Sequence, residues 1–119
     1  MEKKFLGFLS WFTRFKFKRG LKHFGQRLSR GWDDSDTWNL ERVIAAFIIP
    51  RLEKFREVTI AHPIDLTPEQ WDEVLGKMIF SFRYTLTRFD EGWVDEPEMH
   101  EKYKEGMRLF AEYFDGLWW

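Results

Sequence analysis

The sequence predicts a mainly α-helical protein: a small antiparallel bundle of three body helices, preceded by a basic amphipathic helical segment. Apolar residues recur at the three- and four-residue spacing of an α-helix through most of the chain. Helix-start and helix-stop residues interrupt that spacing and leave only short loops between the predicted helices. Hydrophobic residues make up 44% and charged residues 33% of the 119 residues, a balance typical of a globular protein. We therefore expect a single domain, residues 1–119.

Charge divides this domain into two parts. Residues 1–30 carry nine Lys or Arg against one Glu, whereas residues 31–119 carry ten against nineteen Asp or Glu. The chain is thus a basic, aromatic-rich head followed by an acidic helical body.

The head is expected to form an amphipathic helix with a break near residues 16–20. Two apolar stripes keep helical spacing but point to different sides, so one straight helix cannot present both on one face. The first stripe consists of Phe5, Phe8, Leu9, Trp11, Phe12 and Phe15, and the second of Phe17, Leu21, Phe24 and Leu28.

The first body helix is predicted at about residues 36–57. Asp36 is a suitable N-cap, because a short carboxylate accepts hydrogen bonds from the free backbone N–H groups of a first turn. Pro50 removes a backbone donor inside the pattern, which predicts a kink there rather than a break. The apolar face of this helix is Leu40, Val43, Ile44, Phe47, Ile48, Leu52 and Phe55.

The second body helix is predicted at about residues 68–89. Thr67 can cap it, Pro68 suits the first helical position, and Gln70 can complete a reciprocal capping box. Residues 80–86 also alternate between apolar and polar, so helix and strand both remain open there.

The third body helix is predicted at about residues 96–115. Asp95 is the expected N-cap and Pro97 lies in the first turn. Gly116 stands where a left-handed C-terminal cap is common.

Catalytic residues are sparse. The chain has no Cys and only three His, and no Ser or Thr stands in a nucleophile context. The pairs Glu69/Asp72 and Glu98/Glu101 could hold Mg²⁺ as in all-α nucleotide pyrophosphohydrolases, but the two motifs occur in the reverse order, and the helix dipole alone explains acids in first turns. We expect no cofactor, and this enzyme reading is an alternative.

The candidate binding site is centred on residues 30–40. Trp32 and Trp38 can form stacking walls, and either Arg30 or Arg42 can supply paired hydrogen-bond donors. The Asp residues can accept hydrogen bonds, and together these groups suit a nucleobase or a small polar ligand. The competing interpretation is a capped turn whose Trp side chains close the end of the bundle. The candidate ligand-binding residues are Arg30, Trp32, Asp33, Asp34, Trp38, Arg42, Trp93, Tyr103, Trp118 and Trp119.

The basic head allows two further interpretations. A helix rich in Phe, Lys and Arg is typical of segments that lie on anionic membranes or bind single-stranded nucleic acid. Alternatively, the head pairs with the acidic body while its rings complete the core. No apolar window approaches the roughly 20 residues that a transmembrane helix needs, so we expect a cytoplasmic protein.

The sequence also resembles small accessory proteins of tailed-phage genomes. The segments that carry the resemblance are residues 30–40, 48–52, 67–73, 77–79 and 105–110, with Phe114 and the final Trp118-Trp119. The resemblance implies a small phage protein in the host cytoplasm that acts by binding, for example against host defence. We therefore expect a non-catalytic binding protein whose partner is a nucleotide-like signal, a host defence protein or a second copy of the chain.

Overall fold

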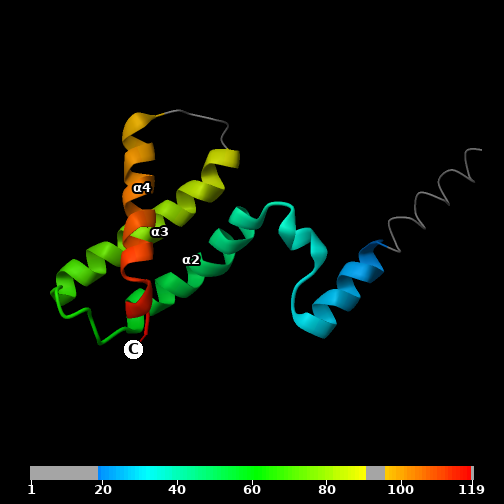
Figure 1. Ribbon diagram of the computed structural model, residues 1–119, viewed down its shortest axis with the longest axis horizontal. Helices are drawn as coiled ribbons and strands as arrows, with labels where there is room; N and C mark the ends of the chain where they lie inside the picture. The colour runs from blue at the N-terminus through cyan, green and yellow to red at the C-terminus, as the bar shows by residue number, and fades with distance from the viewer. Residues whose placement is uncertain (1–18, 91–95, 119) are drawn as a thin grey trace, which may run out of the picture. The chain divides into compact units, whose positions relative to one another are not determined.

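The described residues, 19–90 and 96–118 of the computed structural model, are helical over most of their length and contain no strand (Figure 1). The mainly α fold class is thereby confirmed. The chain contacts divide into two compact units, Met1–Leu40 and Glu41–Trp119. The first expected apolar stripe, at residues 5–15, lies outside the described residues. The described elements are a helix over residues 19–30, η1 (Asp34–Thr37), α2 (Leu40–Val58), α3 (Pro68–Asp90), α4 (Pro97–Glu112) and η2 (Phe114–Gly116).

The start of the first body helix differs from the prediction. Residues 34–37 form the separate 3-10 helix η1, and α2 begins only at Leu40. Asp33 is the N-cap of η1, whereas Asp36 is its third residue and accepts from the Asp33 backbone N–H at 3.4 Å. The prediction that Asp36 is the cap was therefore wrong. Two acids three residues apart both suit a first turn, and spacing alone does not decide which of them caps it.

Helix α2 continues through Pro50 as a single helix. Its buried residues are Ala45 and Leu52, and Phe55 packs against the core beside them. Three residues of the predicted apolar face are instead exposed, because they lie about a third of a turn away from Ala45 and Leu52 on the helix. These exposed residues are Leu40, Ile44 and Phe47.

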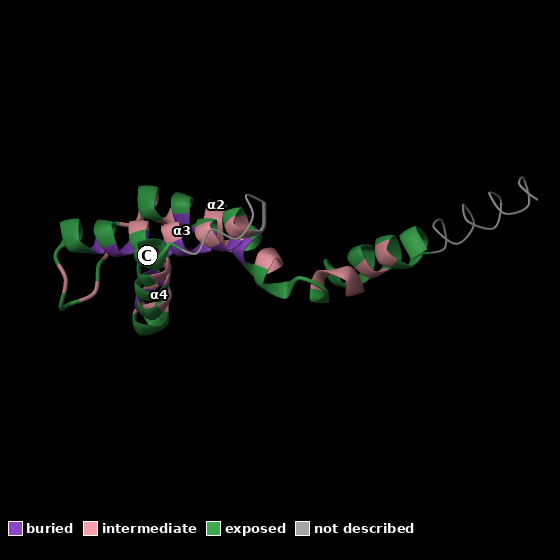
Figure 2. Cartoon of the chain, turned by 90° about the horizontal axis from the view of Figure 1, so that it is seen from above, coloured by how far each residue is buried: buried purple, intermediate pink, exposed green. Residues whose placement is uncertain are grey.

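Helix α3 supplies most of the core of residues 41–119. Its start has the predicted capping box: Thr67 N–H donates to Gln70 Oε1 at 2.9 Å, and Gln70 N–H donates to Thr67 Oγ1 at 3.1 Å. Residues 80–86 are helical, which decides against a strand there. Figure 2 shows the buried residues concentrated along this helix. They include Trp71, Val74, Leu75, Met78, Ile79 and Phe82.

Helices α2 and α3 run in opposite directions on either side of the loop 59–67 (Figure 1). Arg56 near the end of α2 forms a two-pronged ion pair with Asp72 near the start of α3, at 2.8 and 3.0 Å. Farther from the loop, Arg83 of α3 pairs with Glu53 of α2. Exposed pairs of this kind stabilise little, on the order of 0 to 1 kcal/mol, so burial of apolar side chains has to hold the two helices together.

Helix α4 crosses α3 (Figures 1 and 2), and the two backbones approach each other closely at Gly106. A Cβ atom at Gly106 would lie 1.8 Å from Ser81 Oγ and 2.3 Å from the Lys77 carbonyl oxygen. The Ser81 hydroxyl donates across the crossing to the carbonyl oxygen of Tyr103 at 2.9 Å. Only glycine fits this position, so the absence of a side chain at residue 106 determines how closely α3 and α4 approach each other.

Both ends of α4 differ in detail from the prediction. The N-cap is Glu96, whose side chain makes no capping bond, and Pro97 follows it at the start of the helix. The predicted cap, Asp95, lies outside the described residues. Gly116 belongs to η2, and among the described residues only Gly31 has a positive φ, of 80°. The prediction of a left-handed cap at Gly116 was therefore wrong.

Replacing Gly106 by Ala should destabilise residues 41–119, because the added methyl group overlaps Ser81 and the α3 backbone and forces the helices apart. We expect a loss of about 1–3 kcal/mol in the free energy of unfolding, measured by chemical denaturation followed by circular dichroism. Gly76→Ala is the matched control, since its methyl group would meet only the flexible Arg56 side chain, at 3.1 Å. Equal stability of both variants would contradict the close crossing.

Candidate binding site

Residues 31–37 fold back onto the helix formed by residues 19–30. Gly31 makes the reversal, since its φ of 80° lies in the left-handed region that glycine enters without strain. Its N–H donates to the Arg27 carbonyl oxygen at 2.9 Å and so satisfies the end of the helix. The left-handed helix end that the sequence placed at Gly116 is therefore found here.

Among the charged residues described between 19 and 40, Asp33 is the most buried, with 1% of the residue exposed. Its carboxylate accepts from Ser35 N–H at 2.8 Å, from the Ser35 hydroxyl and from Arg27 Nε. His23 Nδ1 lies 4.0 Å from the same carboxylate. The hydrogen bonds from Ser35 and Arg27 hold the pKa of Asp33 well below its usual range, because they favour the charged form.

Asp34 binds a neighbouring edge of the same helix. Gln26 Nε2 donates to the Asp34 carboxylate, and the Asp34 N–H donates back to Gln26 Oε1, both at 2.8 Å. Arg30 Nη2 donates to the carboxylate at 2.7 Å, and Lys22 Nζ lies 3.4 Å from it. The bonds from Gln26 and Arg30 lower the pKa of Asp34 to about 2. Both Asp residues thus serve to hold the turn against the helix.

Each of the two Trp residues of the segment stacks against an arginine. The guanidinium of Arg30 lies 3.6 Å from the ring centre of Trp32, and that of Arg19 lies 4.5 Å from the ring centre of Trp38. His23 meets the Trp38 ring edge-on at 5.8 Å. Both Trp residues remain exposed. A guanidinium of the chain itself therefore lies on one side of each ring that was predicted to stack on a ligand.

The opposite side of helix 19–30 carries an exposed apolar stripe. Leu21, Phe24 and Leu28 are 52%, 59% and 73% exposed. At 100° per residue these side chains fall within about 60° of one another and lie on average opposite Lys22, Gln26 and Arg30, which bind Asp34. Arg27, which binds Asp33, lies about 60° from Phe24 on the helix. The polar side of the helix therefore holds residues 33–37, and residues 31–37 do not cover Leu21, Phe24 and Leu28. We call Leu21, Phe24 and Leu28 the apolar stripe.

The remaining predicted site residues lie elsewhere. Arg42 belongs to α2, and Tyr103 belongs to α4, where it packs against Tyr84 with ring centres 5.4 Å apart. Trp93 and Trp119 lie outside the described residues. Arg30, Trp32, Asp33, Asp34 and Trp38 are the predicted residues that the structure brings into one group.

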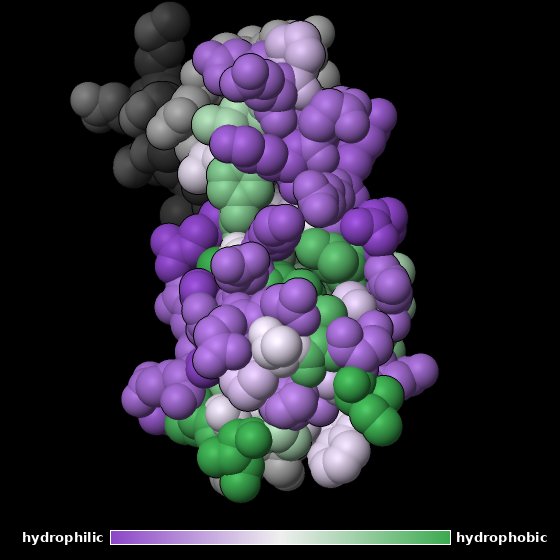
Figure 3. Space-filling view, turned by 90° about the vertical axis from the view of Figure 1, so that its left-hand side faces the viewer, coloured by the Kyte–Doolittle hydropathy of each residue, from purple (hydrophilic) through white to green (hydrophobic). Residues whose placement is uncertain are grey.

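Trp118 lines a cavity of about 480 Å³ between the chain end and the loop 59–67. Tyr113 lies in the same cavity, and its hydroxyl donates to Asp65 Oδ2 at 3.0 Å. This hydrogen bond raises the pKa of Tyr113 above its usual value. The end of the molecule that carries this loop exposes apolar surface among polar groups, as Figure 3 shows. Ile60 and Ile64 of the loop are almost fully exposed.

The acid pairs considered for Mg²⁺ do not converge on one site. Asp72 is bound to Arg56, and Glu101 lies 3.8 Å from Lys104. The Arg56 contact lowers the pKa of Asp72. Within residues 19–90 and 96–118, no group of three or more His, Asp or Glu could hold a metal ion.

Sequence reasoning missed the groups that bind the Asp residues. Lys22, Gln26 and Arg30 repeat at four-residue spacing, so they form one edge of a helix, and this spacing was the available signal. It was overlooked because Leu21, Phe24 and Leu28 dominate the pattern over the same residues. Trp71 was likewise not among the predicted site residues.

Comparisons of the chain with protein-family models, curated proteins and solved structures found no match. None of the helices in the described part of the chain is long and apolar enough to span a membrane. Function is therefore inferred from the contacts that the described residues make.

Acidification should release residues 33–37 from helix 19–30. The pKa of Asp34 is lowered to about 2 on folding, so its contacts stabilise the unit fully above the unfolded value near 4 and lose that contribution as the pH falls toward 2. The ¹³Cα chemical shifts of residues 22–30 should move toward coil values over this range. Asp34→Asn should weaken the change, and shifts that stay constant down to pH 2 would contradict it.

Proposed function

We propose that the protein is a non-catalytic binding protein that docks the apolar stripe of helix 19–30 into a groove on a partner protein. The observation that carries the proposal is the exposure of Leu21, Phe24 and Leu28 together on one helix face. Amphipathic helices bind grooves through anchors three to four residues apart, and this stripe has that spacing. Contiguous exposed apolar surface on a folded helix is typical of an interaction site.

The charges of residues 19–40 favour a protein over a nucleic acid or an anionic membrane as the partner of the apolar stripe. Residues 19–40 contain four Lys or Arg and three Asp. Arg27 and Arg30 are already paired with Asp33 and Asp34. Binding to phosphate groups depends on cations that are free to neutralise them, and most of the positive charge here is neutralised within the chain. Burial of the apolar stripe is the larger available source of affinity.

Trp32 and Trp38 can add to the same interface. Trp and Arg are frequent among the few residues that dominate binding energy, and each ring here is held in place by a guanidinium. The same stacking argues against a nucleotide at this position, since a base would have to displace an arginine or use the other ring face. A nucleotide-like ligand is accordingly the second candidate, supported by the exposure of both rings.

The resemblance to accessory phage proteins bears on the kind of partner. It rests on residue patterns such as residues 30–40 and 67–73. If the protein acts in a phage-infected cell, the proposed partner is a host protein, and we expect it to be a component of host defence. The docking proposal itself depends only on the apolar stripe.

A photo-crosslinking amino acid at position 24 should capture the partner in bacterial cells. We expect a covalent adduct with a protein when Phe24 is replaced, and no adduct when the exposed Ile64 of the loop 59–67 is replaced instead. Adding Leu21→Gln and Leu28→Gln should reduce the yield at least about tenfold, because burial of each side chain contributes about 1.5–3 kcal/mol. Gln is a good helix former, so the helix itself should persist.

Crosslinking and vesicle binding separate the alternatives. A protein partner would be contradicted if position 24 crosslinked to lipid or nucleic acid. It would also be contradicted if the purified protein bound anionic vesicles and the two Gln substitutions abolished that binding. Either result would favour the membrane or nucleic-acid interpretation. Nucleotide-dependent changes in Trp fluorescence that disappear in Trp32→Phe would favour the second candidate.

A further inference from the structure

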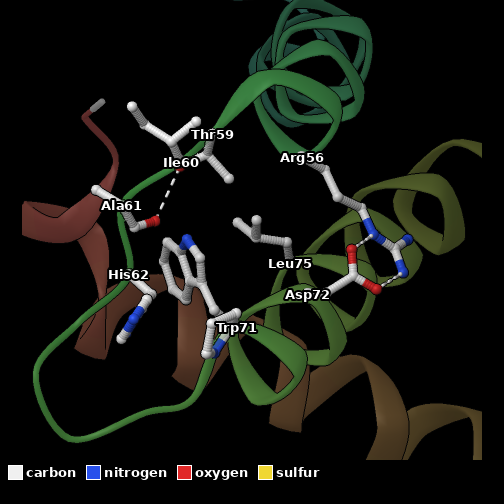
Figure 4. A pocket seen from close by; sticks show the side chains of 9 residues that line it. Arg56, Thr59, Ile60, Ala61, His62, Trp71, Asp72 and Leu75 are labelled. Atoms are coloured by element: carbon white, nitrogen blue, oxygen red, sulfur yellow. Dashed lines mark hydrogen bonds and ion pairs between the residues drawn. The ribbon is translucent and has the colours of Figure 1, made fainter.

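A second site lies in residues 41–119, at the junction of α2, the loop 59–67 and α3. The junction forms a pocket of about 170 Å³ that is partly open to solvent, shown in Figure 4. Ile60 and Ala61 of the loop and Pro68 and Leu75 of α3 form its apolar walls. An apolar cavity of about 150 Å³ is large enough to bind benzene, so this one suits a single six-membered ring.

The indole of Trp71 points into this cavity, with its nitrogen toward Thr59 and Ala61 (Figure 4). Trp71 is 2% exposed, and its Nε1 is buried without a hydrogen-bond partner. An indole nitrogen can only donate, and a buried donor without an acceptor costs about 1–3 kcal/mol. The cavity therefore contains a donor that lacks its acceptor.

The ring cannot easily turn to find another partner. Phe55 meets the Trp71 ring edge-on at 6.4 Å, and Tyr113 meets it edge-on at 5.8 Å. Rings packed at these distances fix one another, since close-packed interiors leave little room for rotation. The acceptor has to come to the nitrogen from within the cavity.

The other polar side chains that line the cavity are Arg56, Thr59, His62 and Asp72, and each has a partner. His62 Nδ1 lies 3.0 Å from the carbonyl oxygen of Pro63. The Thr59 hydroxyl donates to the Ala61 carbonyl oxygen at 3.0 Å. Arg56 and Asp72 bind each other and so neutralise their charges at the rim. A carboxylate or an amine would lose its hydration without gaining an uncompensated opposite charge from the Arg56–Asp72 pair, whereas a neutral acceptor would replace its hydrogen bond to water with one from Trp71 Nε1.

We propose that this cavity binds a neutral molecule of about one ring in size that carries a carbonyl group. The carbonyl oxygen accepts from Trp71 Nε1, and the ring fills the space between Ala61, Pro68 and Leu75. The site contains none of the residues of the apolar stripe. An experiment that disproves one of the two proposals therefore leaves the other unaffected.

The indole N–H signals in a ¹H–¹⁵N spectrum test this directly, with cyclohexanone as the probe. The Trp71 signal, assigned by its absence in Trp71→Phe, should move downfield on addition of cyclohexanone. Methylenecyclohexane has nearly the same shape but lacks the oxygen, so it should leave the signal close to its starting position. An unchanged Trp71 signal with cyclohexanone, as expected if a water molecule alone serves the donor, would overturn the proposal.

Ala61→Leu provides a second test that keeps Trp71 in place. Ala61 lies on the loop and is only partly buried, so a larger side chain there should fill the cavity without unfolding the helices. We expect cyclohexanone affinity to fall at least about tenfold, with circular dichroism unchanged. Binding of wild-type strength in the Ala61→Leu protein, or an equal response to methylenecyclohexane, would show that the ligand lies elsewhere.

Discussion

The arrangement of residues 19–40 depends on the burial of the Asp33 carboxylate against Arg27 and Ser35. A buried carboxylate is costly unless hydrogen bonds and an opposite charge compensate it, and here both do. These contacts hold the chain in the reversal that begins at Gly31. They also occupy the polar side of helix 19–30. The apolar stripe is what this arrangement leaves uncovered, so the proposed docking surface is a consequence of the way the Asp residues are bound.

Residues 41–119 depend on a different constraint, the absence of a side chain at Gly106. The close crossing there lets Ser81 bond to the backbone of α4 and brings Leu109 into the core formed mainly by α3. The core cluster draws its residues from α2, α3, α4 and the segments that adjoin them. The same packing fixes Trp71 in an orientation that leaves its nitrogen facing a cavity.

Local signals were read correctly where neighbouring residues alone decide the structure. The capping box of Thr67 and Gln70 is such a case, because all its partners lie within one helical turn. The choice between Asp33 and Asp36 as cap depended on a partner, Arg27, that reaches the turn only after the chain reverses. The cavity beside Trp71 could not be predicted, since periodicity identifies a buried ring but not which of its atoms lacks a partner.

The central claim is that the apolar stripe faces solvent in the free protein. Solvent paramagnetic relaxation of ¹³C-labelled Leu methyl groups, measured with a soluble gadolinium agent, tests it most directly. Leu21 and Leu28 should relax strongly, whereas Leu75 and Leu109, which lie in the core, should relax weakly. Protection of Leu21 and Leu28 to the level of Leu75 in the free monomer would contradict the claim, because the stripe would then already be covered.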